Sequence, residues 1–307
     1  MSLALSGDAL PGIAALAMVF GVVLLLRGRR GVRETTLVGP WWWLLASLLA
    51  VGGVEIVAHW LLAGASRDWL DLLRYVAAMA TFCPLVSLLG AKRPQSRAWK
   101  FIVLSLLGVL SLPAIRALAI GRGEGIDTHV ARQWFAVALI AVGPLNYVLT
   151  RYAPATFVFA LAQVFLLGEH LPGGQNLAFA GSQVVGLMLI LLAICLTVVC
   201  RGSRHTAKSF ARLWLDFRNM YGSLWSLRVV ERLNAEAESH DWPVRFCWGG
   251  MVRADGDPSL EIEISAETMT AVSSTMRAVL SRFVSPGWID ERWGEVTPGQ
   301  PRALARG

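Results

Sequence analysis

Long apolar runs fill the chain up to residue 200 and are separated by short polar segments. Each run has about 17–24 residues, enough for a helix to cross a hydrocarbon core of roughly 30 Å. The pattern therefore predicts an all-α polytopic membrane bundle over residues 1–200. The seven predicted transmembrane helices cover residues 10–26, 40–63, 69–90, 101–120, 133–150, 153–169 and 178–200.

The apolar pattern changes character in residues 205–240, where apolar side chains recur mostly three and four positions apart. This spacing predicts one long amphipathic helix, broken near Gly222. A basic amphipathic helix just inside a membrane can lie on an anionic inner leaflet. Alternatively, its apolar face packs on the rest of the tail. The membrane hypothesis assigns lipid contact to the first half, with the basic residues Arg201, Arg204, Lys208, Arg212 and Arg218 at the surface.

Two alternating stretches follow this helix. Residues 243–252 and 260–264 place apolar side chains at every second position, which predicts two half-buried strands. The sequence ADGDP between them has the composition of a turn, so the strands are expected to form a hairpin. A domain of this size can bury only a modest core and is expected to lean on the membrane, on the loops or on a partner.

A second tail helix is predicted from Ser265 to about residue 283, because serine is a good N-cap. Pro286 and Gly287 are expected to end this helix. Residues 201–290 are therefore predicted to form a small α+β (α-β-β-α) domain, with residues 291–307 as a flexible end.

Charge sets the expected orientation. Only 16% of residues are charged, against about 25% in a typical soluble domain. By the positive-inside rule the side with more basic loop residues is cytoplasmic, which predicts an N-out/C-in, multi-pass protein of the plasma (inner) membrane. The net charge of +7 then reflects topology, so no nucleic-acid partner is expected. The loops after the second, fourth and sixth predicted spans contain only Arg67, Arg122 and Arg132. The basic residues of the loops after the first, third and fifth spans are Arg27, Arg29, Arg30, Arg33, Lys92, Arg93, Arg97, Lys100 and Arg151.

Polar residues inside the apolar runs form the candidate site. Glu55 and His59 lie four positions apart in "VGGVEIVAHW" and therefore share a helix face. Counting residues from the helix ends places polar groups of five predicted spans in the outer half of the bundle. This predicted polar layer consists of Glu55, His59, Asp71, Arg74, Arg116, Gln163 and Gln183.

The polar layer has two interpretations. It is either a set of buried ion pairs that fix helix positions, or an outward-facing pocket, because ionisable residues inside a membrane are functional candidates by default. In both cases Glu55 is expected to pair with Arg74 or Arg116. Glu55 and His59 alone supply fewer ligands than the three usual in catalytic zinc sites, so no metal is assigned.

The functional hypotheses follow from this layer and from the tail. The first is a non-catalytic membrane subunit, or an assembly or accessory factor, whose tail binds protein partners in the membrane or the cytoplasm. The second is an integral-membrane enzyme or a protein that handles a small molecule (an anion, a quinone or haem) in the outer pocket. The third is a transporter, which requires polar groups in the inner half as well, where the sequence has few. No cofactor is assigned.

Overall fold

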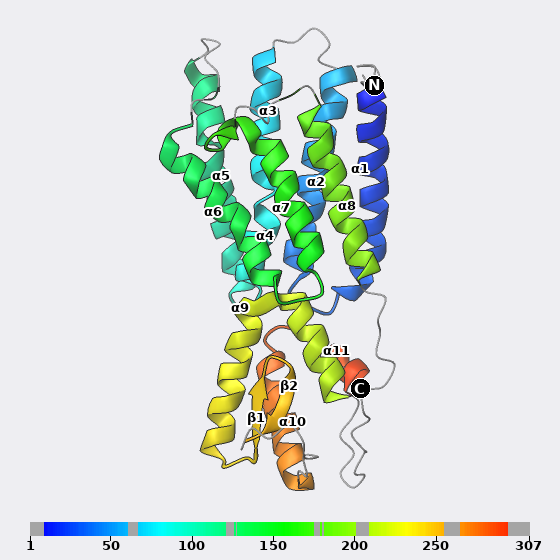
Figure 1. The fold of residues 1–307 in the computed structure, drawn as a ribbon, viewed down its shortest axis with the longest axis vertical. Helices are drawn as coiled ribbons and strands as arrows, with labels where there is room; N and C mark the ends of the chain where they lie inside the picture. Colours follow the sequence, from blue (N-terminus) through cyan, green and yellow to red (C-terminus); the bar gives the residue numbers. More distant parts are fainter. Residues whose placement is uncertain are drawn as a thin grey trace. The chain divides into compact units, whose positions relative to one another are not determined.

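A computed structural model describes residues 9–60, 67–120, 126, 128–174, 179, 181–200, 209–254 and 265–293 (Figure 1). Contacts between residues divide the chain into two units. The first unit contains residues 1–33 and 37–202, and the second contains residues 34–36 and 203–307. The first unit is a helical bundle, and the second is a small domain of helices around a two-stranded sheet.

The first unit is built from helices that lie side by side along its length (Figure 1). They are α1 (Ala9–Gly28), η1 (Arg29–Gly31), α2 (Val38–Trp60), α3 (Arg67–Ala80), α4 (Cys83–Leu89), α5 (Ser96–Ile120), α6 (Val130–Tyr147), α7 (Ala153–Leu167), η2 (Gly168–His170) and α8 (Ser182–Val199). Among the described residues, six helical segments are long and apolar enough to cross a membrane. The predicted helical membrane bundle is therefore confirmed for six spans.

Helix α6 coincides with the fifth predicted span, 133–150, and is not among those six segments. It carries Arg132 and Gln133 near its start and Asn146 near its end, and these residues lower its mean hydropathy. The helix itself is present, so it is left out of the six segments because of its mean hydropathy and not because of its secondary structure.

The third predicted span, 69–90, matches a membrane-long segment at Trp69–Leu89, and the structure divides this segment into two helices. A turn at Thr81 and Phe82 separates α3 from α4. Pro84 stands at the start of α4, where it has no N–H to donate and where its ring clashes with a preceding carbonyl in a continuous helix. The Thr81 hydroxyl instead donates to the Ala78 carbonyl at 2.6 Å.

Small residues let the bundle helices approach closely. A Cβ atom on Gly186 of α8 would lie 2.6 Å from the Leu166 side chain of α7. One on Gly52 of α2 would lie 2.8 Å from Met18 of α1. Glycines at such positions are typical of packed membrane helices. The face of α2 near Glu55 therefore meets another helix, as its small residues indicate.

The second unit begins with α9 (Phe210–Ser239). The helix is kinked at Gly222, whose φ of 75° and ψ of −170° are accessible almost only to glycine, so the predicted break is confirmed. The apolar residues before the kink are buried in the second unit rather than exposed. They are Phe210, Leu213, Trp214, Phe217 and Tyr221.

The sheet of the second unit is a tight hairpin of β1 (Val244–Cys247) and β2 (Gly250–Arg253). The prediction of a single strand over 243–252 is wrong, because the chain reverses between Cys247 and Gly250, which are paired across the turn. Gly250 has a φ of 140°, which a side chain would disfavour. The predicted strand 260–264 lies outside the described residues.

Two helices complete the second unit. Helix α10 (Ala266–Leu280) begins as predicted, with the Ser265 hydroxyl accepting from the Thr268 N–H at 3.1 Å. Helix α10 stops before Pro286, as predicted, and Pro286 begins a further helix, α11 (Pro286–Arg292). Proline is favoured at the first position of a helix, and Ser285 supplies the N-cap. Part of the end that was expected to be flexible is thus helical.

A tripeptide from the loop between α1 and α2 belongs to the second unit. The Thr36 N–H donates to the Phe283 carbonyl at 2.8 Å, and the Ser285 N–H donates to the Glu34 carbonyl at 2.8 Å. The Ser285 hydroxyl also donates to Glu34 Oε2 at 2.8 Å. The tail domain is therefore completed by residues more than 200 positions away, a feature that no local pattern predicts.

Candidate functional site

Glu55 of α2 and Arg74 of α3 form a bidentate ion pair. Arg74 Nε donates to Glu55 Oε1 at 2.7 Å, and Nη2 donates to Oε2 at 3.0 Å. Asp71, one turn before Arg74, adds a longer contact of 3.7 Å to the guanidinium. The Glu55 side chain is 11% exposed and that of Arg74 is 32% exposed. Of the two partners expected for Glu55, the structure selects Arg74.

Other members of the predicted polar layer do not join this ion pair. Gln163 of α7 is fully buried, and its Nε2 donates to the Thr81 carbonyl and hydroxyl, each at 3.2 Å. Gln183 of α8 donates to the Leu166 carbonyl at 3.2 Å. The Gln163 amide therefore joins α7 to the turn between α3 and α4, and the Gln183 amide joins α8 to α7.

Two further members are not brought to Glu55. Arg116 of α5 is exposed, and no described residue forms an ion pair with it. His59 lies near the end of α2, and its side chain falls outside the part of the chain that the structure describes. The described layer thus consists of one ion-paired cluster and two glutamines that are hydrogen-bonded separately from it, rather than one continuous pocket.

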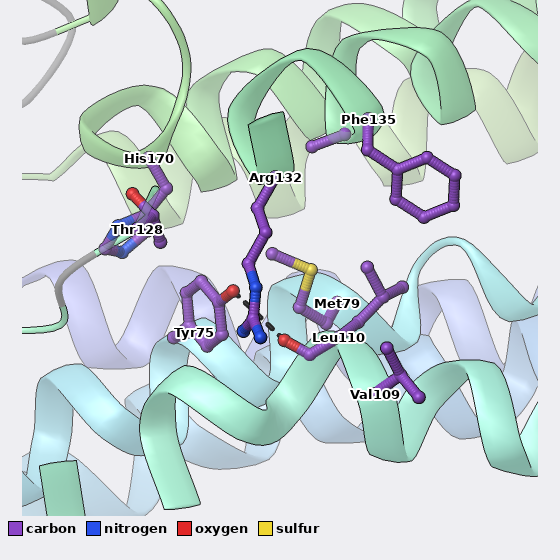
Figure 2. A pocket seen from close by; sticks show the side chains of 9 residues that line it. Tyr75, Met79, Val109, Leu110, Thr128, Arg132, Phe135 and His170 are labelled. Atoms are coloured by element: carbon purple, nitrogen blue, oxygen red, sulfur yellow. Dashed lines mark hydrogen bonds between the residues drawn. The ribbon is translucent and has the colours of Figure 1, made fainter. Parts of the chain in front are cut away.

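A cavity of about 50 Å³ lies elsewhere in the bundle, between α3, α5 and α6 (Figure 2). A volume of this size holds a few water molecules, since one water needs roughly 10–15 Å³. Arg132 is its one charged lining residue. The lining consists of Tyr75, Met79, Val109, Leu110, Thr128, Arg132, Phe135, Ala136 and His170.

Tyr75 organises the cavity wall. Its hydroxyl donates to the Leu110 carbonyl of α5 at 3.0 Å, and its ring meets the His170 imidazole edge to face at 4.7 Å. Figure 2 shows the Arg132 side chain extending from α6 toward Tyr75. The groups that face the space are thus a guanidinium, an imidazole and the Thr128 hydroxyl, which can bind water or a small anion.

The sequence did not single out this cavity. Arg132 is among the loop residues of the charge pattern, and His170 directly follows the predicted span 153–169. The signal available was Tyr75 itself, a side chain with a polar tip within an apolar run, directly after Arg74. Glu55 does not line the cavity, so the space described does not reach the ion pair.

The predicted membrane-surface residues of the tail have different surroundings. Arg218 donates from Nη1 to the Trp248 carbonyl at 2.9 Å, and its guanidinium lies 4.9 Å from the centre of the Trp248 ring. Burial lowers the pKa of Arg218 from its ordinary value because it removes water from the charged group. Arg212 is partly buried. The remaining three, Arg201, Arg204 and Lys208, lie outside the described residues.

Comparison with protein-family models, with curated proteins and with solved structures found no match to this chain. Function is therefore inferred from the contacts within the molecule alone.

Proposed function

We propose that this protein is an accessory subunit or assembly factor of a larger membrane complex, with its tail as a cytoplasmic interaction domain. The ion pair between Glu55 and Arg74 carries this proposal. Arg74 occupies both carboxylate oxygens of Glu55, the acidic group that a binding pocket would use, and the pair holds α2 against α3. The described cavity is too small for a quinone or a haem. Both observations favour a bundle that serves as a rigid platform.

The proposed topology has seven crossings, with the N-terminus outside. With six crossings, the loop after α1 and the tail would face opposite sides of the membrane. Residues of that loop, Glu34 and Thr36, are hydrogen-bonded to Ser285 and Phe283 of the tail, which requires one side for both. Counting α6 as a crossing meets this requirement. The basic loop residues favour the cytoplasm as that side and the plasma (inner) membrane as the location.

The tail is suited to binding a partner because it is joined to the membrane helices at two places in the sequence. One is the tripeptide at 34–36, which is flanked by α1 and α2. The other is the segment that follows α8. A partner bound to the tail would therefore be connected to the membrane helices through two chain segments and not through a single linker.

Native size tests the proposal. The tagged chain, expressed at its normal level in its own membrane and extracted in mild detergent, should migrate in a complex well above its own mass of 33.4 kDa. Native mass spectrometry should give a fixed stoichiometry of other subunits. Expression in a foreign membrane is the control and should give the chain alone. A chain that is also alone in its own membrane, even after crosslinking, would contradict the proposal.

A second candidate function is the handling of a small anion in the cavity. Arg132 favours it, since the lining contains this one charged residue and no carboxylate. In this alternative, Arg132→Gln abolishes anion-dependent thermal stabilisation of the purified chain. The matched control Arg116→Gln removes an equal charge from an exposed position of α5 and leaves the effect intact.

A further inference from the structure

Two neighbouring leucines are exposed on the tail, just after the kink of α9. Leu224 is 38% exposed and Leu227 is 55% exposed. All other large hydrophobic residues that are exposed in the described chain belong to the first unit. Single exposed leucines are ordinary on a protein surface, but these two lie three residues apart and so share one face of the helix.

The kink that precedes these leucines is tied to the loop between two membrane helices. The Tyr221 hydroxyl lies 3.1 Å from the Thr36 hydroxyl and donates to the Phe283 carbonyl at 2.8 Å. Thr36 precedes the first residue of α2 by two positions, a distance that the chain spans in about 7 Å. Leu224 and Leu227 follow Tyr221 within about two helical turns.

Features of α1 and α2 mark the start of the membrane near this loop. Trp42 is 49% exposed, and the Arg29 guanidinium lies 5.5 Å from the centre of its ring. Tryptophans gather at the level of the lipid headgroups, where an apolar ring and a polar group are both accommodated. Chain length from Trp42 through Thr36 to Tyr221 thus keeps the two leucines within reach of that level.

The charge around the leucines suits an anionic surface. Arg228 is exposed directly beside Leu227 and four positions after Leu224. It is the first charged residue after Arg218. The next two, Glu231 and Arg232, are also exposed, so residues 219–232 have a net charge of +1. Apolar side chains next to a basic residue are the composition by which helices lie in the interface of an anionic leaflet.

We propose that Leu224, Leu227 and Arg228 dock the tail on the headgroup region of the inner leaflet, with anionic lipid as the ligand. This face, which we term the leucine corner, differs from the first half of α9, whose apolar residues are buried in the tail itself. The choice of the inner leaflet rests on the proposed orientation. The contact with lipid does not depend on that orientation.

Fluorescence quenching in lipid nanodiscs tests the leucine corner on the full chain. The native cysteines are replaced, and a single Leu227→Cys carries an environment-sensitive dye. Ala235→Cys is the matched control, because Ala235 is exposed on the same helix two turns further on. Lipid that is spin-labelled near its headgroup should quench the dye at 227 several-fold more than at 235. Equal quenching at the two positions would overturn the proposal.

Two further measurements test whether anionic lipid is the ligand: quenching in nanodiscs of different lipid composition, and hydrogen exchange of the unmodified chain. Quenching at 227 should be stronger in anionic than in neutral nanodiscs and should weaken with salt, because exposed charges are screened over about 10 Å at 0.1 M. Equal quenching in both lipids would remove anionic lipid as the ligand. In the unmodified chain, hydrogen exchange of residues 223–230 should slow in anionic discs, and unchanged exchange would also overturn the proposal.

Protection that appears only in native membranes would identify a protein as the occupant and reject lipid. Nanodiscs expose both membrane faces, so these results are independent of orientation. They are also independent of the native size of the complex. Failure of the leucine corner is thus distinguishable from failure of the proposed function.

Discussion

Arg74 holds both carboxylate oxygens of Glu55, at 2.7 and 3.0 Å, and thereby joins α3 to α2. Paired donors in this geometry are among the strongest hydrogen bonds in proteins. Inside a bilayer each partner would be costly alone, so the pair is expected to form as α2 and α3 pack together.

Glu55→Gln should therefore destabilise the bundle. Loss of one partner of a fully buried pair costs about 3–5 kcal/mol, and the cost here should be smaller because Arg74 is 32% exposed. Thermal unfolding in detergent measures the effect. Arg116→Gln is the control and should change little. Wild-type stability of Glu55→Gln would contradict a structural role.

The double variant Glu55→Gln with Arg74→Gln separates structure from function. With both charges removed, no uncompensated charge remains, so most of the stability should return. If the pair is structural, the double variant should also complement a deletion in cells. A stable, inserted double variant that fails to complement would instead indicate that the pair belongs to a functional pocket.

Cysteine accessibility should report seven crossings. Cysteines at positions 65 and 125 should be labelled from outside intact cells. Cysteines at exposed Gln95 and Ala211 should react only after permeabilisation. This result is expected because the hydrogen bonds between the first loop and the tail require both to lie on the same side of the membrane. Labelling of both 95 and 211 in intact cells would reverse the orientation. Labelling of only one of the two in intact cells would exclude α6 as a crossing.

Ser285→Ala should weaken the attachment of the tail to the loop. The serine hydroxyl caps α11 and donates to Glu34, and the loss of a cap costs about 1 kcal/mol. Faster proteolysis within residues 281–293 of the full chain should reveal the change. Ser281→Ala is the control, because that hydroxyl bonds only to the Ala278 carbonyl of its own helix in the described structure. Equal proteolysis of the two variants would contradict a role for Ser285.

The tail without the loop should be marginally stable. Residues 205–293 expressed alone lack Glu34–Thr36, so Phe283 and Ser285 lose the backbone partners described above. A synthetic peptide covering 32–38, added in excess, should raise the denaturation midpoint of this fragment. A scrambled peptide is the control. No response to the native sequence would show that the loop adds nothing to the stability of the tail.

Gly222→Ala should destabilise the tail more than a substitution beside it. Its φ of 75° and ψ of −170° are essentially restricted to glycine, and strain of this kind costs about 1–3 kcal/mol. Ser223→Ala, at the next position, is the control. Denaturant midpoints of the full chain, followed by tail tryptophan fluorescence, compare the two. Similar midpoints would show that the kink can relax into a continuous helix.

Local patterns in the sequence determined most of the helices. The apolar runs predicted the membrane helices because length and hydropathy are properties of each segment alone. The break at Gly222 and the start of α10 after Ser265 were also predictable, since backbone freedom and capping act within one turn. A single strand over 243–252 was wrongly predicted because Trp248 and Gly249 form a two-residue turn that the alternation of apolar residues does not reveal.

The tertiary structure decided which distant groups meet. Arg74 and Arg116 both bring positive charge to the level of Glu55 in the sequence, and only the packing of α3 against α2 selects Arg74. The joining of Thr36 to Phe283, and of Tyr75 to Leu110, likewise depends on helices from separate parts of the chain. Such contacts carry no periodic signal, because hydrogen bonds across the fold depend on where whole elements pack and not on the spacing of residues within one.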